Sequence, residues 1–212
     1  YINNFLHHLS GNVEPTEPPT SIDHKNRIRY QEEGQWIEHK ATFRVHTQGE
    51  GLIGKTDKKL ETIVAKEICG MLNTGGGWLY IGVSEIKRKK GDIKPDVTGI
   101  ELDIRSLDNP KKGKIGNFEL LEAHFRRTIR NYIVLPTDLK FKIQELFSVE
   151  EVKYDEGVSV MAVRVFPWAE GNAAYRESSK SEVAVEYRRR GASKNTDKTG
   201  SWSLKNKFWT KI

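Results

Sequence analysis

Three consecutive glycines, Gly75–Gly77, stand between an amphipathic run and an apolar run in the stretch LNTGGGWLYIGVSE. Glycine-rich turns often hold phosphate, because their backbone N–H groups can approach an anion closely. A P-loop places its glycines after a strand and before a helix, and Lys-Ser or Lys-Thr follows. Here the predicted order is helix, glycines, strand, and no such pair follows. A tight helix-to-strand turn explains the glycines sterically, and close approach of another backbone segment is the alternative.

Basic side chains are concentrated in three clusters, a pattern that favours contact with phosphate groups. The clusters are Lys87, Arg88, Lys89 and Lys90; Lys111, Lys112 and Lys114; and Arg188, Arg189 and Arg190. In a strand, alternation places Arg188 and Arg190 on one face. Ordinary solvated loops are the alternative interpretation of the first two clusters. Trp168 and Tyr175 are candidates for stacking on bases, with core packing as the alternative.

The composition also favours a polyanionic partner. The chain has 212 residues, a formal net charge of +6 and 30% charged residues, although a soluble protein with many surface lysines has the same charge. The single cysteine, Cys69, favours an intracellular, reducing compartment, the cytoplasm or alternatively the nucleus. Cys69 lies in a helical apolar pattern, which predicts a small buried side chain and no nucleophile. No apolar run is long enough to cross a membrane, so no membrane partner is expected.

The spacing of apolar residues predicts an α+β domain with a mixed β-sheet flanked by two main helices. The helices are expected over residues 57–73, where the glycines end the helix, and over 117–132. Strands are expected over 36–43, 78–83, 139–149, 158–166 and 183–188, irregular segments over 47–56 and 86–96, and a short helix over 201–212. Residues 1–28 are expected to form an N-terminal tail with a Pro-rich linker, and residues 29–212 the folded domain.

Three stretches resemble motifs of the Schlafen family, in its AlbA-type (divergent AAA-type) domain. The first, NTGGGWLYIGVSE (73–85), is similar to the family's NT-x-GG-aromatic-x-x-IGV-acid-acid motif. QEEGQWIEHK (31–40) resembles its opening E-x-x-x-x-E-F-K strand, and YRRRGAS (187–193) its closing Tyr-x-Arg-x-Gly-Ser-Ser stretch. The resemblance implies an α+β nucleic-acid-binding module. Some members are metal-dependent endoribonucleases that act on transfer RNA and similar folded RNAs, and others are described as DNA-binding domains.

The nuclease members have three acids in the site, two in the opening motif and one after the IGV strand. Glu33 and Glu38 match the first two at the same spacing, and Glu85 matches the third by position, with Ser84 in place of the preceding acid. The resemblance implies that these three glutamates are catalytic and bind Mg²⁺ or Mn²⁺. The side chains then expected to contact nucleic acid are Lys40, Lys87, Arg88, Lys89, Lys90, Arg188 and Arg190.

The chemistry of carboxylates agrees with this interpretation. Carboxylate oxygens are preferred ligands of Mg²⁺ and Mn²⁺, and such ions neutralise charge on a scissile phosphate and activate a nucleophile. Residues five apart on a regular strand point to opposite faces, so Glu33 and Glu38 share a site only if the chain bends between them. Gly34 is the expected break. A solvated surface charge is the alternative for each acid.

The sequence therefore predicts a divalent-metal-dependent endoribonuclease domain that cleaves structured RNA, such as a transfer RNA or a small-RNA precursor. One alternative is a non-catalytic DNA- or RNA-binding module in which the acids are incidental. The other is a subunit of a homo- or hetero-oligomer with other Schlafen-like subunits, docked through residues 1–28.

Overall fold

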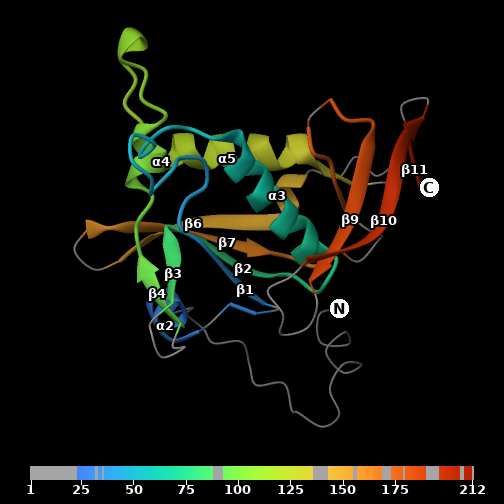
Figure 1. The fold of residues 1–212 in the computed structure, drawn as a ribbon, viewed down its shortest axis with the longest axis horizontal. Helices are drawn as coiled ribbons and strands as arrows, with labels where there is room; N and C mark the ends of the chain where they lie inside the picture. Colours follow the sequence, from blue (N-terminus) through green and yellow to red (C-terminus); the bar gives the residue numbers. More distant parts are fainter. Residues whose placement is uncertain are drawn as a thin grey trace.

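The structure, a computed structural model, describes residues 23–31, 33–34, 36–87, 93–135, 143–154, 157–168, 173–178, 180–189, 196–205 and 208–211. It is an α+β fold that contains a mixed sheet, as predicted (Figure 1). The helices are α2 (His24–Tyr30), α3 (Lys58–Leu72), α4 (Glu101–Arg105) and α5 (Phe118–Tyr132), with the 3₁₀ turns η1 (Pro110–Lys112) and η2 (Ile143–Leu146). The strands are β1 (Ile37–Lys40), β2 (Gly77–Ile81), β3 (Val83–Lys87), β4 (Ile93–Val97), β5 (Ile133–Val134), β6 (Phe147–Lys153), β7 (Ser159–Val165), β8 (Ala174–Tyr175), β9 (Val183–Arg189), β10 (Thr196–Lys205) and β11 (Phe208–Lys211).

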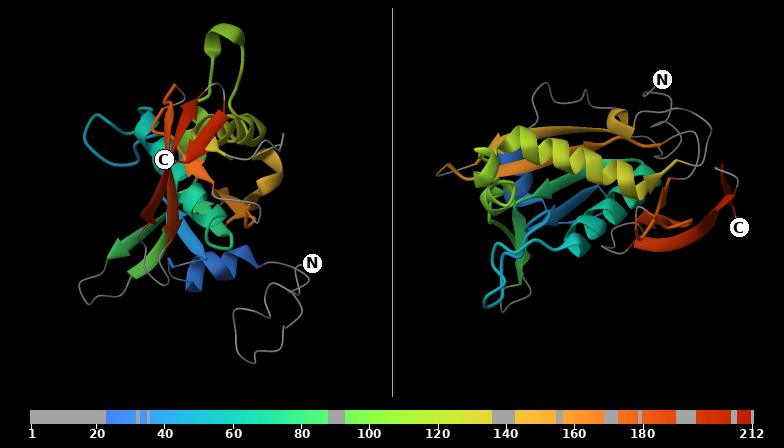
Figure 2. Two further views of the ribbon diagram at one scale, coloured as in Figure 1. Left: turned by 90° about the vertical axis from the view of Figure 1, so that its right-hand side faces the viewer. Right: turned by 90° about the horizontal axis from the view of Figure 1, so that it is seen from above.

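The central sheet has the strand order β1-β2-β7-β6, in which β1 is parallel to β2 and the other neighbours are antiparallel. The helices α3 and α5 lie over one face and α2 lies on the other (Figures 1 and 2). Alternation along β2 sends Leu79 and Ile81 into the large core under α3 and α5, and Trp78 and Tyr80 into a smaller core with Ile28 of α2. The nearly continuous apolar sequence of β2 follows from this burial on both faces.

Both predicted main helices are confirmed. Asp57 accepts the backbone N–H of Lys59 at 2.8 Å and begins α3, and Asn117 accepts that of Leu120 at 2.9 Å and begins α5. The stripe of α5 is buried at every turn, with the side chains of Leu121, Phe125 and Ile129 all 0% exposed.

The glycine run joins α3 to β2, and all three glycines have positive φ angles, of 109°, 85° and 150°. A Cβ on Gly76 would lie 2.4 Å from the carbonyl oxygen of Val165, and one on Gly77 would lie 2.7 Å from that of Trp36. Both explanations offered from the sequence therefore apply, because the turn is tight and two other backbone segments press against it.

A second sheet, with the order β11-β10-β9-β8-β5, lies beyond the end of α3 that carries the glycine turn (Figure 2). Asn73, the C-cap residue of α3, joins the two parts of the fold. Its side-chain amide donates to the carbonyl oxygens of Ala173 and Tyr187, each at 2.8 Å, and its Oδ1 accepts the N–H of Ala173 at 2.7 Å.

Three predicted elements differ from the structure. Residues 201–212 were expected to be helical, but Trp202 and Leu204 lie in β10, which pairs with β11 in an antiparallel hairpin. The strand expected over 78–83 ends at Ile81, because Gly82 takes a φ of 96° and starts a new strand. The segment 86–96 contributes to the paired strands β3 and β4, with residues 88–92 outside the described part of the chain.

The remaining boundaries shift by a few residues. The strand expected over 139–149 is observed as β6, Phe147–Lys153, and residues 136–142 are not described. At the N-terminal side, α2 packs His24 and Ile28 against the sheet, so packed structure extends before the boundary placed after residue 28. No helix among the described residues is long and apolar enough to span a bilayer.

Candidate functional site

The chain turns back on itself directly before β1. The backbone N–H of Gly34 donates to the carbonyl oxygen of Ile37 at 2.9 Å, and the Oε1 atom of Glu33 accepts the backbone N–H of His39 at 3.0 Å. Because β1 is the edge strand of its sheet, this carboxylate satisfies a donor on the open edge. The bend expected at Gly34 is confirmed, and it folds Glu33 back beside the strand that carries Glu38.

Glu38 lies within β1 and is only 3% exposed. Its register partner on β2 is Leu79, and Leu79 faces the large core. The Lys40 ammonium, two residues along the same strand, forms an ion pair with the Glu38 carboxylate. Burial of a carboxylate is costly unless a cation compensates its charge. The ion pair therefore holds two opposite charges together at the edge of the sheet.

The third predicted acid, Glu85, follows on β3. The N–H of Gly82 donates to the carbonyl oxygen of Lys40 at 2.8 Å, so β3 starts beside the end of β1. Glu85 is opposite Pro95 of β4. It therefore stands within a strand, whereas the sequence placed it at a strand end. The structure describes its backbone and not its side chain.

The donor set suits a hard divalent cation, because all three predicted ligands are carboxylates. Glu33 and Glu38 are the two whose side chains are described; Glu33 lies in the bend before β1 and Glu38 lies within β1. Among the described side chains, no group of three His, Cys, Asp or Glu residues is arranged to hold a metal ion. The side chain of Glu85 lies outside that set.

The structure describes the side chains of some of the predicted basic residues and not of others. Lys40 lies beside Glu38, and Arg188 is exposed on β9 opposite Asp197 of β10. Lys87 is the last residue of β3, and only its backbone is described. Four of the predicted contacts lie outside the described residues: Arg88, Lys89, Lys90 and Arg190.

Trp168 and Tyr175 belong to the large core, with exposed fractions of 8% and 7%. Tyr175 stacks against Tyr132 with ring centroids 6.3 Å apart. Of the two interpretations given from the sequence, core packing is therefore the one observed.

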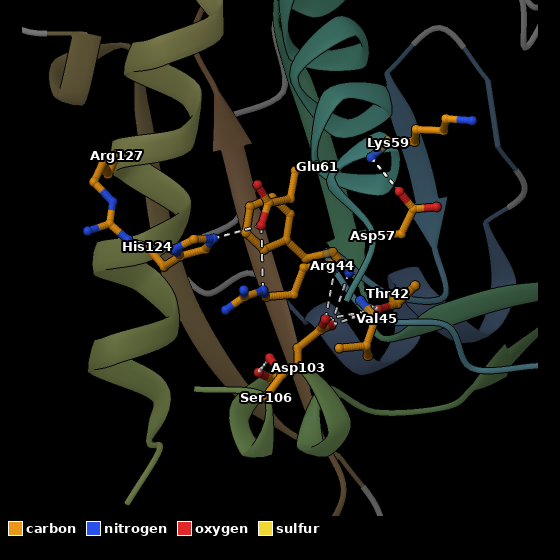
Figure 3. A network of polar contacts seen from close by, with 11 residues as sticks. Thr42, Arg44, Val45, Asp57, Lys59, Glu61, Asp103, Ser106, His124 and Arg127 are labelled. Carbon is orange, nitrogen blue, oxygen red and sulfur yellow. Dashed lines mark hydrogen bonds and ion pairs between the residues drawn. The ribbon is translucent and has the colours of Figure 1, made fainter. Parts of the chain in front are cut away.

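A polar network that the sequence did not predict fixes the segment after β1 (Figure 3). The Asp103 carboxylate, 1% exposed, accepts the Thr42 hydroxyl at 2.9 Å and the backbone N–H groups of Phe43 and Arg44, each at 2.9 Å. Burial raises the pKa of Asp103, and these donors oppose that shift. The network ties α4 to the residues that follow Lys40, and so fixes one end of β1.

A second part of the network crosses from α3 to α5 (Figure 3). The Glu61 carboxylate contacts His124 Nε2 at 2.7 Å and Arg44 Nε at 3.5 Å, while Arg127 Nη2 lies 2.8 Å from His124 Nδ1. Since Arg127 can only donate, Nδ1 accepts and Nε2 carries the proton given to Glu61. Both ring nitrogens are thus engaged, so His124 holds the Glu61 and Arg127 side chains in place.

The described surface on the α2 side of β1 carries a further cluster that sequence reasoning missed. Trp36 is 48% exposed beside the glycine turn, and the guanidinium groups of Arg27 and Arg164 lie 5.6 and 5.8 Å from the centroid of the Trp78 ring. The signal available in the sequence was a tryptophan at the start of the first strand, next to the predicted acids.

Comparison with known proteins gives one family and two solved structures. The family described as Schlafen, AlbA_2 matches residues 33–197. The DIP2311 protein from Corynebacterium diphtheriae is 22% identical, with a TM-score of 0.42, over 78% of this chain and 22% of that one. The N-terminal domain of a RecG-related protein from Nitrosomonas europaea is 16% identical, with a TM-score of 0.32, over 82% of this chain and 84% of that one. No curated protein sequence matches the chain.

The family match spans the bend at Glu33, the edge strand with Glu38 and Lys40, the glycine turn and β9. Because this match covers more than half of the chain, the chain belongs to the Schlafen AlbA_2 family.

Proposed function

We propose that this domain binds structured RNA and cleaves it in a divalent-metal-dependent reaction at Glu33, Glu38 and Glu85. The observation that carries the proposal is the bend at Gly34, which brings the Glu33 carboxylate to within 3.0 Å of the His39 N–H, next to Glu38. Family membership supports nucleic acid as the partner. Lys40 and Arg188 are the described cations proposed to contact phosphate.

In this proposal, the three glutamates would hold Mg²⁺ or Mn²⁺, which supplies charge neutralisation at the scissile phosphate when bound. The acids of the chain orient that ion, and Lys40 holds Glu38 in place and limits its freedom to turn away. Arg188 adds positive charge on β9. The start of β3 beside β1 supports Glu85 as the third ligand, since the Gly82 N–H bonds to Lys40.

The test is cleavage of transfer RNA by the purified chain with Mn²⁺. We expect activity that EDTA abolishes and that Glu38→Gln lowers by about 100-fold or more, the size of loss seen when one preorganised electrostatic group is removed from a catalytic site. Glu50→Gln, at an exposed loop residue, is the matched control. Equal cleavage by wild type and Glu38→Gln would contradict the assignment.

A non-catalytic nucleic-acid-binding module is the second candidate, favoured by one observation. The Glu38 carboxylate is buried and already compensated by Lys40, as in a purely structural ion pair. That function predicts RNA binding that weakens steeply with salt, unchanged by EDTA, with no cleavage by wild type. Assembly with other Schlafen-like subunits, which sequence considerations suggested, would be read from the oligomeric state in the same preparations.

A further inference from the structure

We propose that the cavity between α2 and the glycine turn binds one unpaired base of a nucleic acid, with Trp36 as the stacking platform. The cavity has a volume of about 450 Å³ and opens on the α2 side of β1. Its lining residues are Arg27, Gln31, Gly34, Trp36, Ile37, Gly77 and Trp78. The inference rests on the proposed binding of nucleic acid at β1 and adds which part of the substrate this surface takes.

Trp36 is exposed but held in place. Its indole is 48% exposed, while its carbonyl oxygen accepts the N–H of Trp78 at 2.7 Å. The edge of its six-membered ring lies against Gly75, so close that a Cβ on Gly75 would lie 2.8 Å from it. An exposed tryptophan held in this way offers stacking area at little entropic cost, as in single-strand binding sites.

Positive charge surrounds the same aromatic surface. The guanidinium groups of Arg27 and Arg164 lie within cation–π distance of Trp78, at 5.6 and 5.8 Å from its centroid. Arg164 is exposed on β7, and Gln31 is exposed at the cavity rim. None of the described lining residues carries a carboxylate. Aromatic stacking combined with arginine charge is the chemistry that recognises a nucleobase and its attached phosphate.

The cavity lies next to the bend that carries Glu33 of the proposed acid site. Gly34 lines it, and Gly34 directly follows Glu33. The cavity and the Glu38 side chain lie on opposite faces of the edge strand β1. Ile37 faces the α2 side, and Glu38 has Leu79 of the large core as its neighbour. A strand whose backbone passes Glu33 therefore has a neighbouring base within reach of Trp36. This selects RNA that presents an unpaired nucleotide there.

The experiment measures binding in EDTA, so that cleavage plays no part. Fluorescence anisotropy compares a labelled oligouridylate with an abasic oligomer of the same length and phosphate count. Wild type is expected to bind the abasic oligomer about 5- to 150-fold more weakly, the range for loss of base–aromatic stacking. Trp36→Ala removes this preference, Trp36→Phe keeps most of it, and Ile53→Ala, at an exposed loop residue, leaves it intact.

Thermal unfolding of each variant checks that the fold is kept, and the wild-type comparison needs no variant at all. Equal affinity of wild type for both oligomers, or no binding of either, overturns the inference. If Mn²⁺-dependent cleavage is present while the two oligomers bind equally, the nuclease proposal stands and the base site fails. If base preference is present without cleavage, the base site stands alone.

Discussion

At the residue scale, burial decides what each reactive side chain can do. Glu38 and Cys69 are both buried, at 3% and 0% exposed. Glu38 has Lys40 against its carboxylate, whereas the Cys69 thiol lies 3.4 Å from the carbonyl oxygen of Ala173 in the large core. The Glu38 carboxylate therefore has a cation beside it, whereas burial opposes ionisation of the Cys69 thiol and confirms Cys69 as a packing residue.

Cys69 makes a prediction for the alkaline range. Burial raises the pKa of its thiol from 9.0 to about 12. Between these values the unfolded chain loses the thiol proton and the folded chain keeps it, so the free energy of unfolding falls as pH rises from about 9 towards 12. Cys69→Ala is expected to lower stability at pH 7 by about 1–2 kcal/mol and to flatten this alkaline loss in urea unfolding.

A thiol reagent provides an independent check on the same residue. Native protein at neutral pH is expected to react with a disulfide reagent only at the rate of opening, and urea-unfolded protein at once. Rapid labelling of the native thiol would contradict its inert, buried assignment.

At the element scale, the glycine turn is set by two separate constraints, backbone conformation and close contact. Gly76 has a φ of 85°, and a Cβ there would lie 2.4 Å from the Val165 carbonyl oxygen. Gly54 has a similar φ, 77°, and no atom lies within 4 Å of the position that a Cβ would take there. The two glycines thus separate conformational strain from steric overlap.

We expect Gly54→Ala to cost about 1–2 kcal/mol, since only the left-handed backbone is strained. Gly76→Ala adds about 1–3 kcal/mol for overlap with packed backbone. Urea unfolding of the two variants measures the difference. Equal losses would mean that the turn relaxes freely and that close approach by β7 is unimportant.

At the scale of the whole molecule, the two sheets are joined by the residue that ends α3. The Asn73 side chain makes three hydrogen bonds, to Ala173 twice and to Tyr187 once. Lys66 adds a cation–π contact, 4.5 Å from the Tyr187 ring centroid. The second sheet, which carries Arg188, is thereby held in a fixed place against α3 and the glycine turn.

Asn73→Ala is expected to lower stability by about 2–3 kcal/mol, at about 1 kcal/mol for each hydrogen bond. The loss is local, so hydrogen exchange should accelerate in β8 and β9 before it does in β2 and β7. Asn117→Ala is the control. It also removes a side-chain hydrogen bond at a helix end, here the cap of α5, and is expected to lower stability by about 1 kcal/mol. Uniform acceleration of hydrogen exchange across both sheets in Asn73→Ala would contradict the role of Asn73 in holding the second sheet against α3.

Some of this protein could be predicted from its sequence, because the signals are local. The 3.6-residue spacing of Leu121, Phe125 and Ile129, with Asn117 before them, defines α5 without any knowledge of its neighbours. The reversed order of helix and strand around the glycines argues against a P-loop on the same grounds. Gly34 as the bend between Glu33 and Glu38 follows from strand alternation once the two acids are taken to share a site.

Tertiary structure decided the rest, because burial and strand pairing depend on residues far apart in the chain. The segment with Trp202 becomes a strand since β9 supplies a partner for its backbone. Gly82, where β2 ends, packs closely against Gly99, since a Cβ on Gly82 would lie 2.9 Å from the Gly99 carbonyl carbon. The Asp103 network and the Trp36 cavity join segments separated by long stretches of sequence. Such contacts leave no periodic signal, and only the folded chain brings them together.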